Sequence, residues 1–269
     1  RLKNHILSFR RSYHYNFDTY LNECNICGLL FKDRYLSSTA ESSIALSYGC
    51  SSNSRWGSTR FHKKFVHLLK PSSSDHVLEI GPGDASFSNS YPSSSYLACL
   101  ESAPCTVPNF EYIVGDLNTA SLDSRFSARH FDRIYLFDVF EHLSVPSSFL
   151  ALLKSKLSTT GQIVFQTGNG LIGNRPFPVS HYYYNIPEHK IFLTPSSLDY
   201  ISRKYCLAVD SKPTYHKSYL SIKYLLMSIF RSLITVPVSL FVSLVFRRSI
   251  FPAYLYPRKD HLLVFLSQR

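Results

Sequence analysis

The clearest indication of the fold class of this chain is Val77-Leu78-Glu79-Ile80-Gly81-Pro82-Gly83-Asp84-Ala85-Ser86-Phe87. Its apolar start predicts a buried strand, and its two glycines predict a tight turn that lets the backbone approach a ligand closely. Asp84 is placed to cap a following helix. Strand, glycine-rich turn and helix in this order are the geometry by which open α/β folds hold a nucleotide-like ligand. Two-glycine turns also occur for steric reasons alone, so the stretch leaves its ligand open.

Further apolar runs downstream of the turn predict more strands of the same sheet. They are residues 96–100, 110–114, 131–137 and 161–166. Glu101 ends the first of these runs, 20 positions after Gly81, where an acidic residue can accept hydrogen bonds from a ribose diol. Asp116 follows the second run and can receive an adenine amino group or form a turn with its own backbone. Strands that alternate with helical segments predict an α/β fold with a parallel sheet.

The order of these motifs resembles a class I S-adenosylmethionine-dependent methyltransferase over about residues 56–210 and again at 262–266. The most specific motif is Phe137-Asp138-Val139-Phe140-Glu141-His142-Leu143, where a strand end, an acid and Glu-His-Leu coincide. The other motifs that carry the resemblance are residues 77–87, Glu101, Gly115-Asp116 and 161–169. The resemblance implies a Rossmann-like, doubly wound, mostly parallel seven-stranded sheet whose last strand is antiparallel, with S-adenosylmethionine as cofactor.

The same resemblance implies a cofactor contact for each matching residue. Gly81 and Gly83 are expected against the methionyl part of the cofactor, Glu101 on the ribose and Asp116 on the adenine. The other residues expected at the cofactor site are Glu79, Leu117 and Asp138. Ala85 stands where the family often has a third glycine, a mild departure because alanine fits the start of a helix.

A base is needed only where the acceptor must lose a proton, because the sulfonium of S-adenosylmethionine already makes its methyl group electrophilic. His142 is the first candidate, with His181 and His189 behind it, since a histidine can titrate near neutral pH. A structural role for His142 in its turn is an equal alternative. The tyrosines at 182–184, in a predicted loop, are candidates for lining an acceptor pocket or for packing.

The N-terminal region contains Cys24-Asn25-Ile26-Cys27-Gly28, which is half of a zinc knuckle. Zinc needs four ligands, so Cys24 and Cys27 are expected to bind metal only if a missing partner pair exists, for example upstream of Arg1. Otherwise they are two small free residues. Six cysteines without further paired spacing favour a reducing, cytoplasmic setting.

The net charge of +11 is unevenly distributed, with +6 over residues 1–75, −4 over 76–200 and +9 over 201–269. Residues 224–246 are mostly apolar, with one charge, Arg231, and one helix breaker, Pro237. An arginine inside a membrane span is costly, so we expect two amphipathic helices that lie on an anionic membrane surface. A buried cap, a dimer surface and a true span are the alternatives. Nucleic acid is not favoured, because no recognised binding motif accompanies the basic charge.

The expected organisation is a knuckle-like segment and serine-rich linker (1–55), a methyltransferase core (56–212), a basic and hydrophobic helical insertion (213–258) and the last core strand (259–269). The expected function is methyl transfer to a small or lipid-linked acceptor, such as a lipid-linked sugar or a quinone precursor. The alternative is a binding module that kept the fold and lost the activity. The expected location is the cytoplasm, peripherally on the inner face of a membrane through residues 219–257. The acceptor atom, oxygen, nitrogen or carbon, is left open.

Overall fold

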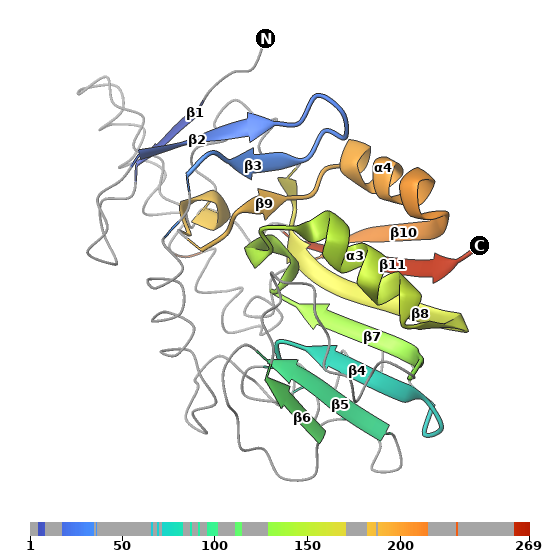
Figure 1. Ribbon diagram of the computed structural model, residues 1–269. Coiled ribbons are helices and arrows are strands. Elements are labelled where there is room, and N and C mark those ends of the chain that lie inside the picture. Colours follow the sequence, from blue (N-terminus) through green and yellow to red (C-terminus); the bar gives the residue numbers. More distant parts are fainter. Residues whose placement is uncertain are drawn as a thin grey trace.

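The computed structural model shows an α/β protein (Figure 1). It describes residues 5–8, 18–34, 36, 66, 69, 72–82, 87, 91, 96–101, 111–114, 129–170, 182–186, 188–214, 230 and 261–269. Several predictions lie outside these residues, namely the helix after the glycine turn, most of the insertion 213–258, and the site residues Gly83, Asp116, Leu117 and His181.

The larger sheet contains seven strands among the described residues, in the order β10-β11-β8-β7-β4-β5-β6. These strands are β4 (His76–Ile80), β5 (Tyr96–Glu101), β6 (Glu111–Val114), β7 (Phe131–Phe137), β8 (Leu157–Gly168), β10 (Leu207–Thr214) and β11 (His261–Gln268). The pairs from β6 across to β8 are parallel, whereas β11 is antiparallel to both β8 and β10. The predicted mostly parallel sheet with an antiparallel last strand is therefore confirmed.

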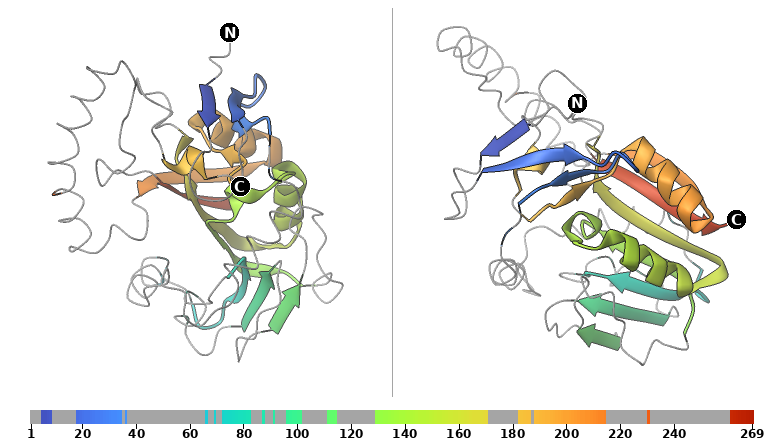
Figure 2. Two further views of the ribbon diagram at one scale, coloured as in Figure 1. Left: turned by 90° about the vertical axis from the view of Figure 1, so that its left-hand side faces the viewer. Right: turned by 45° about the horizontal axis from the view of Figure 1, so that its top comes forward.

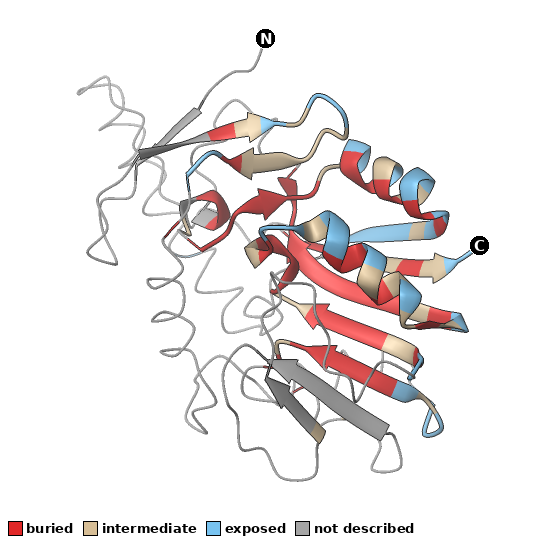
Figure 3. Ribbon diagram, in the orientation of Figure 1, coloured by how far each residue is buried: buried red, intermediate tan, exposed pale blue. Residues whose placement is uncertain are grey.

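The centre of the sheet is buried on both faces, as Figure 3 shows for β4, β7 and β8. Leu78 and Ile80 belong to one apolar cluster and Val77 to another, because successive side chains of a strand point to opposite faces. The helices α3 (Pro146–Ser155) and α4 (Pro195–Tyr205) contribute to the first cluster. A parallel sheet covered on both faces explains why its strands are nearly continuous apolar runs.

The two helices begin where the sequence places a proline. Pro146 opens α3, and Pro195 opens α4 after the N-cap residue Thr194. The backbone N–H of Ser197 donates to Thr194 Oγ1 (3.2 Å), and the N–H of Thr194 donates to Ser197 Oγ (2.8 Å). This capping box satisfies two backbone donors at the helix start.

A second sheet of four strands, in the order β1-β2-β3-β9, was not predicted. It comprises β1 (His5–Ser8), β2 (Asp18–Glu23), β3 (Leu30–Lys32) and β9 (Ile191–Phe192), and all its pairs are antiparallel. Figure 2 shows it as a small sheet beside the larger one. Its last strand comes from the segment between β8 and α4, so the N-terminal residues pair with the middle of the chain.

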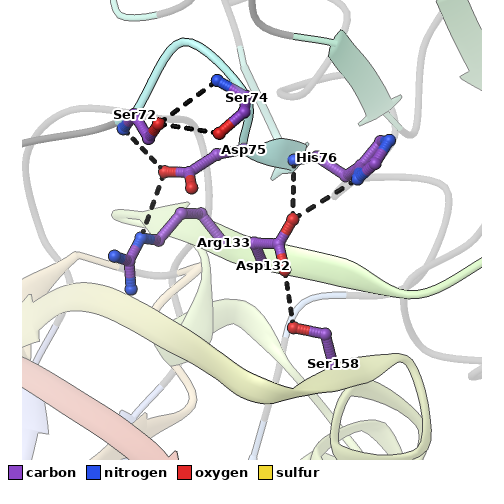
Figure 4. A network of polar contacts seen from close by, with 7 residues as sticks. All are labelled: Ser72, Ser74, Asp75, His76, Asp132, Arg133 and Ser158. Carbon is purple, nitrogen blue, oxygen red and sulfur yellow. Dashed lines mark hydrogen bonds and ion pairs between the residues drawn. The ribbon is translucent and has the colours of Figure 1, made fainter.

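A polar network joins the amino ends of three strands of the larger sheet (Figure 4). The carboxylate of Asp132 accepts hydrogen bonds from the backbone N–H of His76 (2.9 Å) and from Ser158 Oγ (2.7 Å). Arg133 Nε lies 3.4 Å from Asp75 Oδ2. A hollow at the same edge is lined by His76, Arg129, His130 and Phe131. The contacts of this network join the starts of β4, β7 and β8 and so help to hold these strands together. The network lies at the edge of the sheet opposite the glycine turn.

The three tyrosines at 182–184 begin a 3-10 helix, Tyr182–Asn185, where a loop was predicted. Tyr183 and Tyr184 are buried, which supports packing as their role. Throughout the part of the chain that the structure describes, no helix combines the length and the apolar character needed to cross a membrane.

Candidate active site

The glycine turn after β4 packs directly on the segment that follows β7. Gly81 has φ +64°, and a Cβ at this position would lie 2.5 Å from Val139 Cγ2. The strands β4 and β7 are neighbours, with Ile80 opposite Leu136. Only glycine combines the left-handed backbone with this close approach. The turn and the motif after β7 therefore meet at the carboxyl edge of the sheet.

Glu101 stands beside this turn on the next strand. β4 and β5 pair in register, with Ile80 opposite Leu100, so Glu101 at the end of β5 is level with Gly81. This placement fits a ligand that contacts the glycine turn with one part and an acidic group with another. Glu79 lies within β4 with its side chain only 3% exposed. The cofactor contacts of Glu79, Gly81 and Glu101 stay predictions.

Asp138 turns the chain immediately after β7. It has φ +56°, a conformation that aspartate tolerates better than most residues, and its N–H donates to Gln166 O (3.0 Å). Its Oδ1 lies 3.8 Å from Nε2 of His261. His261 begins β11 opposite Gly168, and because β11 is antiparallel, its start lies at the carboxyl edge. No sequence pattern marks His261 as functional, because the direction of its strand is needed to place it at this edge.

Glu141 is completely buried in the middle of the motif after β7. Its carboxylate accepts hydrogen bonds from Thr167 Oγ1 (2.9 Å) and from the hydroxyl of Tyr183. Burial and then the carboxylate of Asp138 raise the pKa of Glu141 to about 7, while the two hydrogen bonds oppose the rise. This carboxyl group is thus poised to change its charge near neutral pH.

His142 and His189 lie with their rings edge to face, 4.8 Å between centroids. Nδ1 of His142 lies 3.2 Å from Glu188 O, and Nδ1 of His189 lies 3.1 Å from Tyr183 O. A carbonyl oxygen can only accept, so Nδ1 carries the hydrogen in both rings. Burial lowers the pKa of His142, and it lowers the pKa of His189 further. Both rings are therefore neutral, and the lone pair of each lies on Nε2.

The N-terminal sheet brings a buried cation close to these histidines. Lys32 at the end of β3 donates from its backbone N–H to Lys190 O (2.9 Å) and from Nζ to Ile186 O (2.5 Å). Burial lowers the pKa of Lys32 to about 7, although the carboxylate of Glu188 opposes the shift. Lys190 is also buried, with Nζ donating to Ser144 Oγ (2.9 Å). Sequence reasoning missed Lys32, because its neighbours lie more than 150 positions along the chain.

Among the predicted site residues, Gly81 packs against Val139, which follows Asp138, and the carboxylate of Asp138 acts on His142, whose ring contacts that of His189. Cys24 and Cys27 lie elsewhere, in the turn between β2 and β3, where Gly28 N donates to Cys24 O (2.7 Å). Hydrogen bonds from the backbone of Cys27 and Ile26 lower the pKa of the Cys24 thiol, and burial raises that of Cys27. Within the described ranges these two thiols belong to no group of three or more metal-ligating residues. Metal binding by the knuckle stays a prediction.

The sequence matches the family model of a methyltransferase domain over residues 56–205. A SAM-dependent methyltransferase from Archaeoglobus fulgidus has a similar structure, with a TM-score of 0.50 at 17% identity over 78% of this chain and 95% of that chain. A cyclopropane-fatty-acyl-phospholipid synthase-like protein from Lactobacillus casei gives 0.49 at 11% identity, over 85% and 99%. Coclaurine N-methyltransferase bound to N-methylheliamine and SAH gives 0.48 at 12% identity, over 78% and 70%. The comparison with curated proteins found no match.

The family model covers more than half of the chain, and the sheet order and strand directions agree with the fold that the motifs imply. The glycine turn, with Glu101 beside it at the carboxyl edge, fits the cofactor of this family. The protein belongs to the class I S-adenosylmethionine-dependent methyltransferases, and S-adenosylmethionine is its cofactor.

Proposed function

We propose that this methyltransferase acts on a small or lipid-linked acceptor whose O–H or N–H group loses its proton to His142. The observation that carries the proposal is the position of a neutral imidazole at the carboxyl edge, in the motif whose Val139 contacts the glycine turn. S-Adenosylmethionine supplies the electrophilic methyl group, which leaves its sulfur as the acceptor atom forms the new bond. The acceptor's proton passes to Nε2 of His142, the nitrogen that carries the lone pair.

His142 fits the role of base better than His189. Both rings are fixed by a carbonyl oxygen at Nδ1, but His142 is partly exposed whereas His189 is only 6% exposed. A base must come within hydrogen-bond distance of the acceptor, so the more accessible ring is the one in a position to contact it. His189, whose ring contacts that of His142, and Glu141, which lies next to His189, are buried polar neighbours of this base. His181 stays a further candidate outside the described residues.

Removal of the imidazole tests this role. His142→Asn should lower kcat/KM for methyl transfer by roughly 10²- to 10⁴-fold, with unchanged affinity for S-adenosylmethionine. The assay follows transfer of a labelled methyl group to a panel of phenols, amines, sugars and their lipid-linked forms, with cofactor affinity measured by calorimetry. His76→Asn is the matched control, since His76 begins β4 and so lies at the opposite edge of the sheet from the glycine turn. Wild-type kcat/KM in His142→Asn would show that another group, or none, takes the proton.

We also propose that residues 219–257 contact an anionic membrane surface on its cytoplasmic side, where a lipid-linked acceptor would be within reach. The basic charge of the last third of the chain supports this, as does Phe230, which is helical and 66% exposed. Vesicles that contain anionic lipid should carry the chain upward in a flotation gradient, and added salt should weaken the association. Flotation that persists after deletion of residues 219–257 would contradict this contact.

A further inference from the structure

Three potential metal ligands converge at the carboxyl edge of the sheet. Glu141 and His142 come from the 3-10 helix Phe140–His142, and His189 comes from the segment before β9. One ligand atom from each of the three lies within 4.8 Å of the other two. Nε2 of His189 is 3.9 Å from Glu141 Oε1. Nδ1 of His189 is engaged by Tyr183 O, so Nε2, on the side of this carboxylate oxygen, is the nitrogen left to bind a metal ion.

The surroundings of these residues hold them as metal-binding side chains are usually held. Each histidine donates its Nδ1–H to a backbone carbonyl, Glu188 O for His142 and Tyr183 O for His189. Glu141 is fixed by the hydroxyls of Thr167 and Tyr183. In metal sites the non-ligating nitrogen of a histidine almost always donates to a carbonyl or carboxylate, which fixes the tautomer and ring orientation.

We propose that Glu141, His142 and His189 bind one divalent transition-metal ion, and that zinc is the ion that this donor set fits best. Two imidazole nitrogens and one carboxylate oxygen are a ligand set of open zinc sites, which keep a fourth position for water or substrate. Magnesium and calcium prefer oxygen ligands throughout. Zinc lies about 2 Å from each ligand, so the three side chains must draw together on binding.

The electrostatic surroundings favour a cation. The carboxylates of Asp138 and Glu188 act on His142, and that of Asp138 acts on Glu141. The opposing ammonium groups in the described part of the chain are those of Lys32 and Lys190. A dication placed between Glu141 and the imidazoles is therefore attracted by carboxylates that outnumber the nearby ammonium groups.

A bound ion and a transferred proton would use the same lone pair of His142. This consequence rests on the proposed function: zinc on Nε2 should suppress methyl transfer that depends on His142, and a chelator should restore it. Zinc binding itself is independent of that role. If zinc binds and has no effect on transfer, the metal site stands and the assignment of His142 as base fails.

Metal binding is measured on the full chain carrying Cys24→Ser and Cys27→Ser, which removes the thiols that could also bind zinc. After treatment with a chelator, zinc is titrated by calorimetry and cobalt(II) by its visible absorption, which reports four-coordinate geometry. We expect one ion per chain at this site. Glu141→Gln and His189→Asn should each weaken binding by at least about tenfold, while His76→Asn, which removes a histidine at the far edge, should leave it unchanged.

Folding of each variant is checked by circular dichroism and by S-adenosylmethionine affinity. If a ligand variant fails to fold, Tyr183→Phe provides the test, because it keeps all three ligands and removes one group that orients Glu141. We expect it to lower zinc affinity by about 10- to 100-fold. Absence of zinc binding in the parent chain would overturn the proposal. So would an affinity that is the same in the parent, Glu141→Gln and His189→Asn, because the ion would then lie elsewhere.

Discussion

At the end of β4, Gly81 combines a φ of +64° with close contact to Val139. A left-handed backbone conformation costs a residue with a side chain about 1–2 kcal/mol, and a Cβ at position 81 would also overlap Val139 Cγ2. Gly81→Ala should therefore lower the free energy of unfolding by at least about 1–2 kcal/mol and weaken S-adenosylmethionine binding. Urea denaturation and calorimetric titration measure the two effects.

The two causes can be separated with a second substitution. Val139→Ala removes the atoms that a Cβ at position 81 would overlap but leaves the backbone strain. Gly81→Ala should therefore cost less stability when it is introduced into Val139→Ala than when it is introduced into the wild type. Equal stability of wild type and Gly81→Ala would show that the turn accommodates a side chain, contrary to the geometry.

Two adjacent tyrosines allow a comparison of charged and neutral hydrogen bonds. Tyr183 donates to the buried carboxylate of Glu141, and Tyr184 donates to Gly170 O (2.9 Å). A bond to a charged group is the stronger, so Tyr183→Phe should cost about 1.5–3 kcal/mol and Tyr184→Phe about 0.5–1.5 kcal/mol. Urea denaturation is best done at about pH 8, above the pKa of about 7 for Glu141. A larger loss for Tyr184→Phe would contradict this ranking.

The burial of Lys32 leads us to expect that the stability of the protein depends on pH. Burial lowers its pKa to about 7 in the folded chain, whereas an unfolded lysine has a pKa of about 10.4. Between these values the unfolded chain binds a proton that the folded chain has released, so this group makes the free energy of unfolding rise with pH. Glu188 and His189 are the charged and titratable groups that face the ammonium.

Lys32→Met should abolish that rise. Between about pH 7 and about pH 9, the free energy of unfolding of the wild type should therefore increase relative to that of the variant. Lys204→Met is the control, because Lys204 is exposed on α4 and its replacement leaves the buried surroundings of Lys32 intact. A constant difference for Lys32→Met would show that Lys32 titrates in its ordinary range.

At the scale of elements, the start of α4 also anchors the N-terminal hairpin. Thr194 Oγ1 accepts from Ser197 N and donates to Gly28 O (2.8 Å). Gly28 packs closely here, since a Cβ on it would lie 2.6 Å from Ser196 Cβ. One hydroxyl thus caps a helix and holds the turn between β2 and β3.

Removing that hydroxyl should cost about 1 kcal/mol or more, because the N-cap alone contributes about that amount. Thr194→Ala should lower the midpoint of urea denaturation, and Thr194→Ser, which keeps the oxygen, should retain most of the stability. If Thr194→Ser loses as much as Thr194→Ala, the methyl group and not the hydroxyl would be responsible.

At the scale of the whole molecule, the two edges of the larger sheet have different tasks. The amino edge carries the network around Asp132, and the carboxyl edge carries the glycine turn and the histidines. Saturation with S-adenosylmethionine at about 100 times its Kd should add about 2.7 kcal/mol to the free energy of unfolding. Glu101→Ala should reduce this increment at the same cofactor concentration.

Asp132→Ala is expected to have the opposite effects to Glu101→Ala. It should lower stability without cofactor, because it removes the acceptor of His76 N and Ser158 Oγ, and keep the full increment with cofactor. Thermal denaturation with and without S-adenosylmethionine measures both terms. Loss of the increment in Asp132→Ala would mean that the two edges are coupled.

The amino-acid sequence alone determined the larger sheet and the place of its ligand edge. Each central strand is a short apolar run whose ends are marked by neighbouring residues, such as the glycines after Ile80 or Pro146 after β7. Such a strand can be recognised without knowing which distant segment it pairs with. His142 and His189 could be selected in the same way, because they stand in motifs that follow or precede such elements. The role of each nevertheless stays a prediction.

Which polar groups lie in contact depends on how distant segments pair in the folded chain. The pairing of β3 with β9 joins residues about 160 positions apart, and it involves strands of three and two residues that carry no periodic signal. Lys32, His261 and the buried carboxylate of Glu141 reach one cluster through that pairing and through the antiparallel direction of β11. Sequence patterns report local periodicity and capping, whereas pKa shifts and metal-ligand geometry arise from burial and from contacts between distant segments.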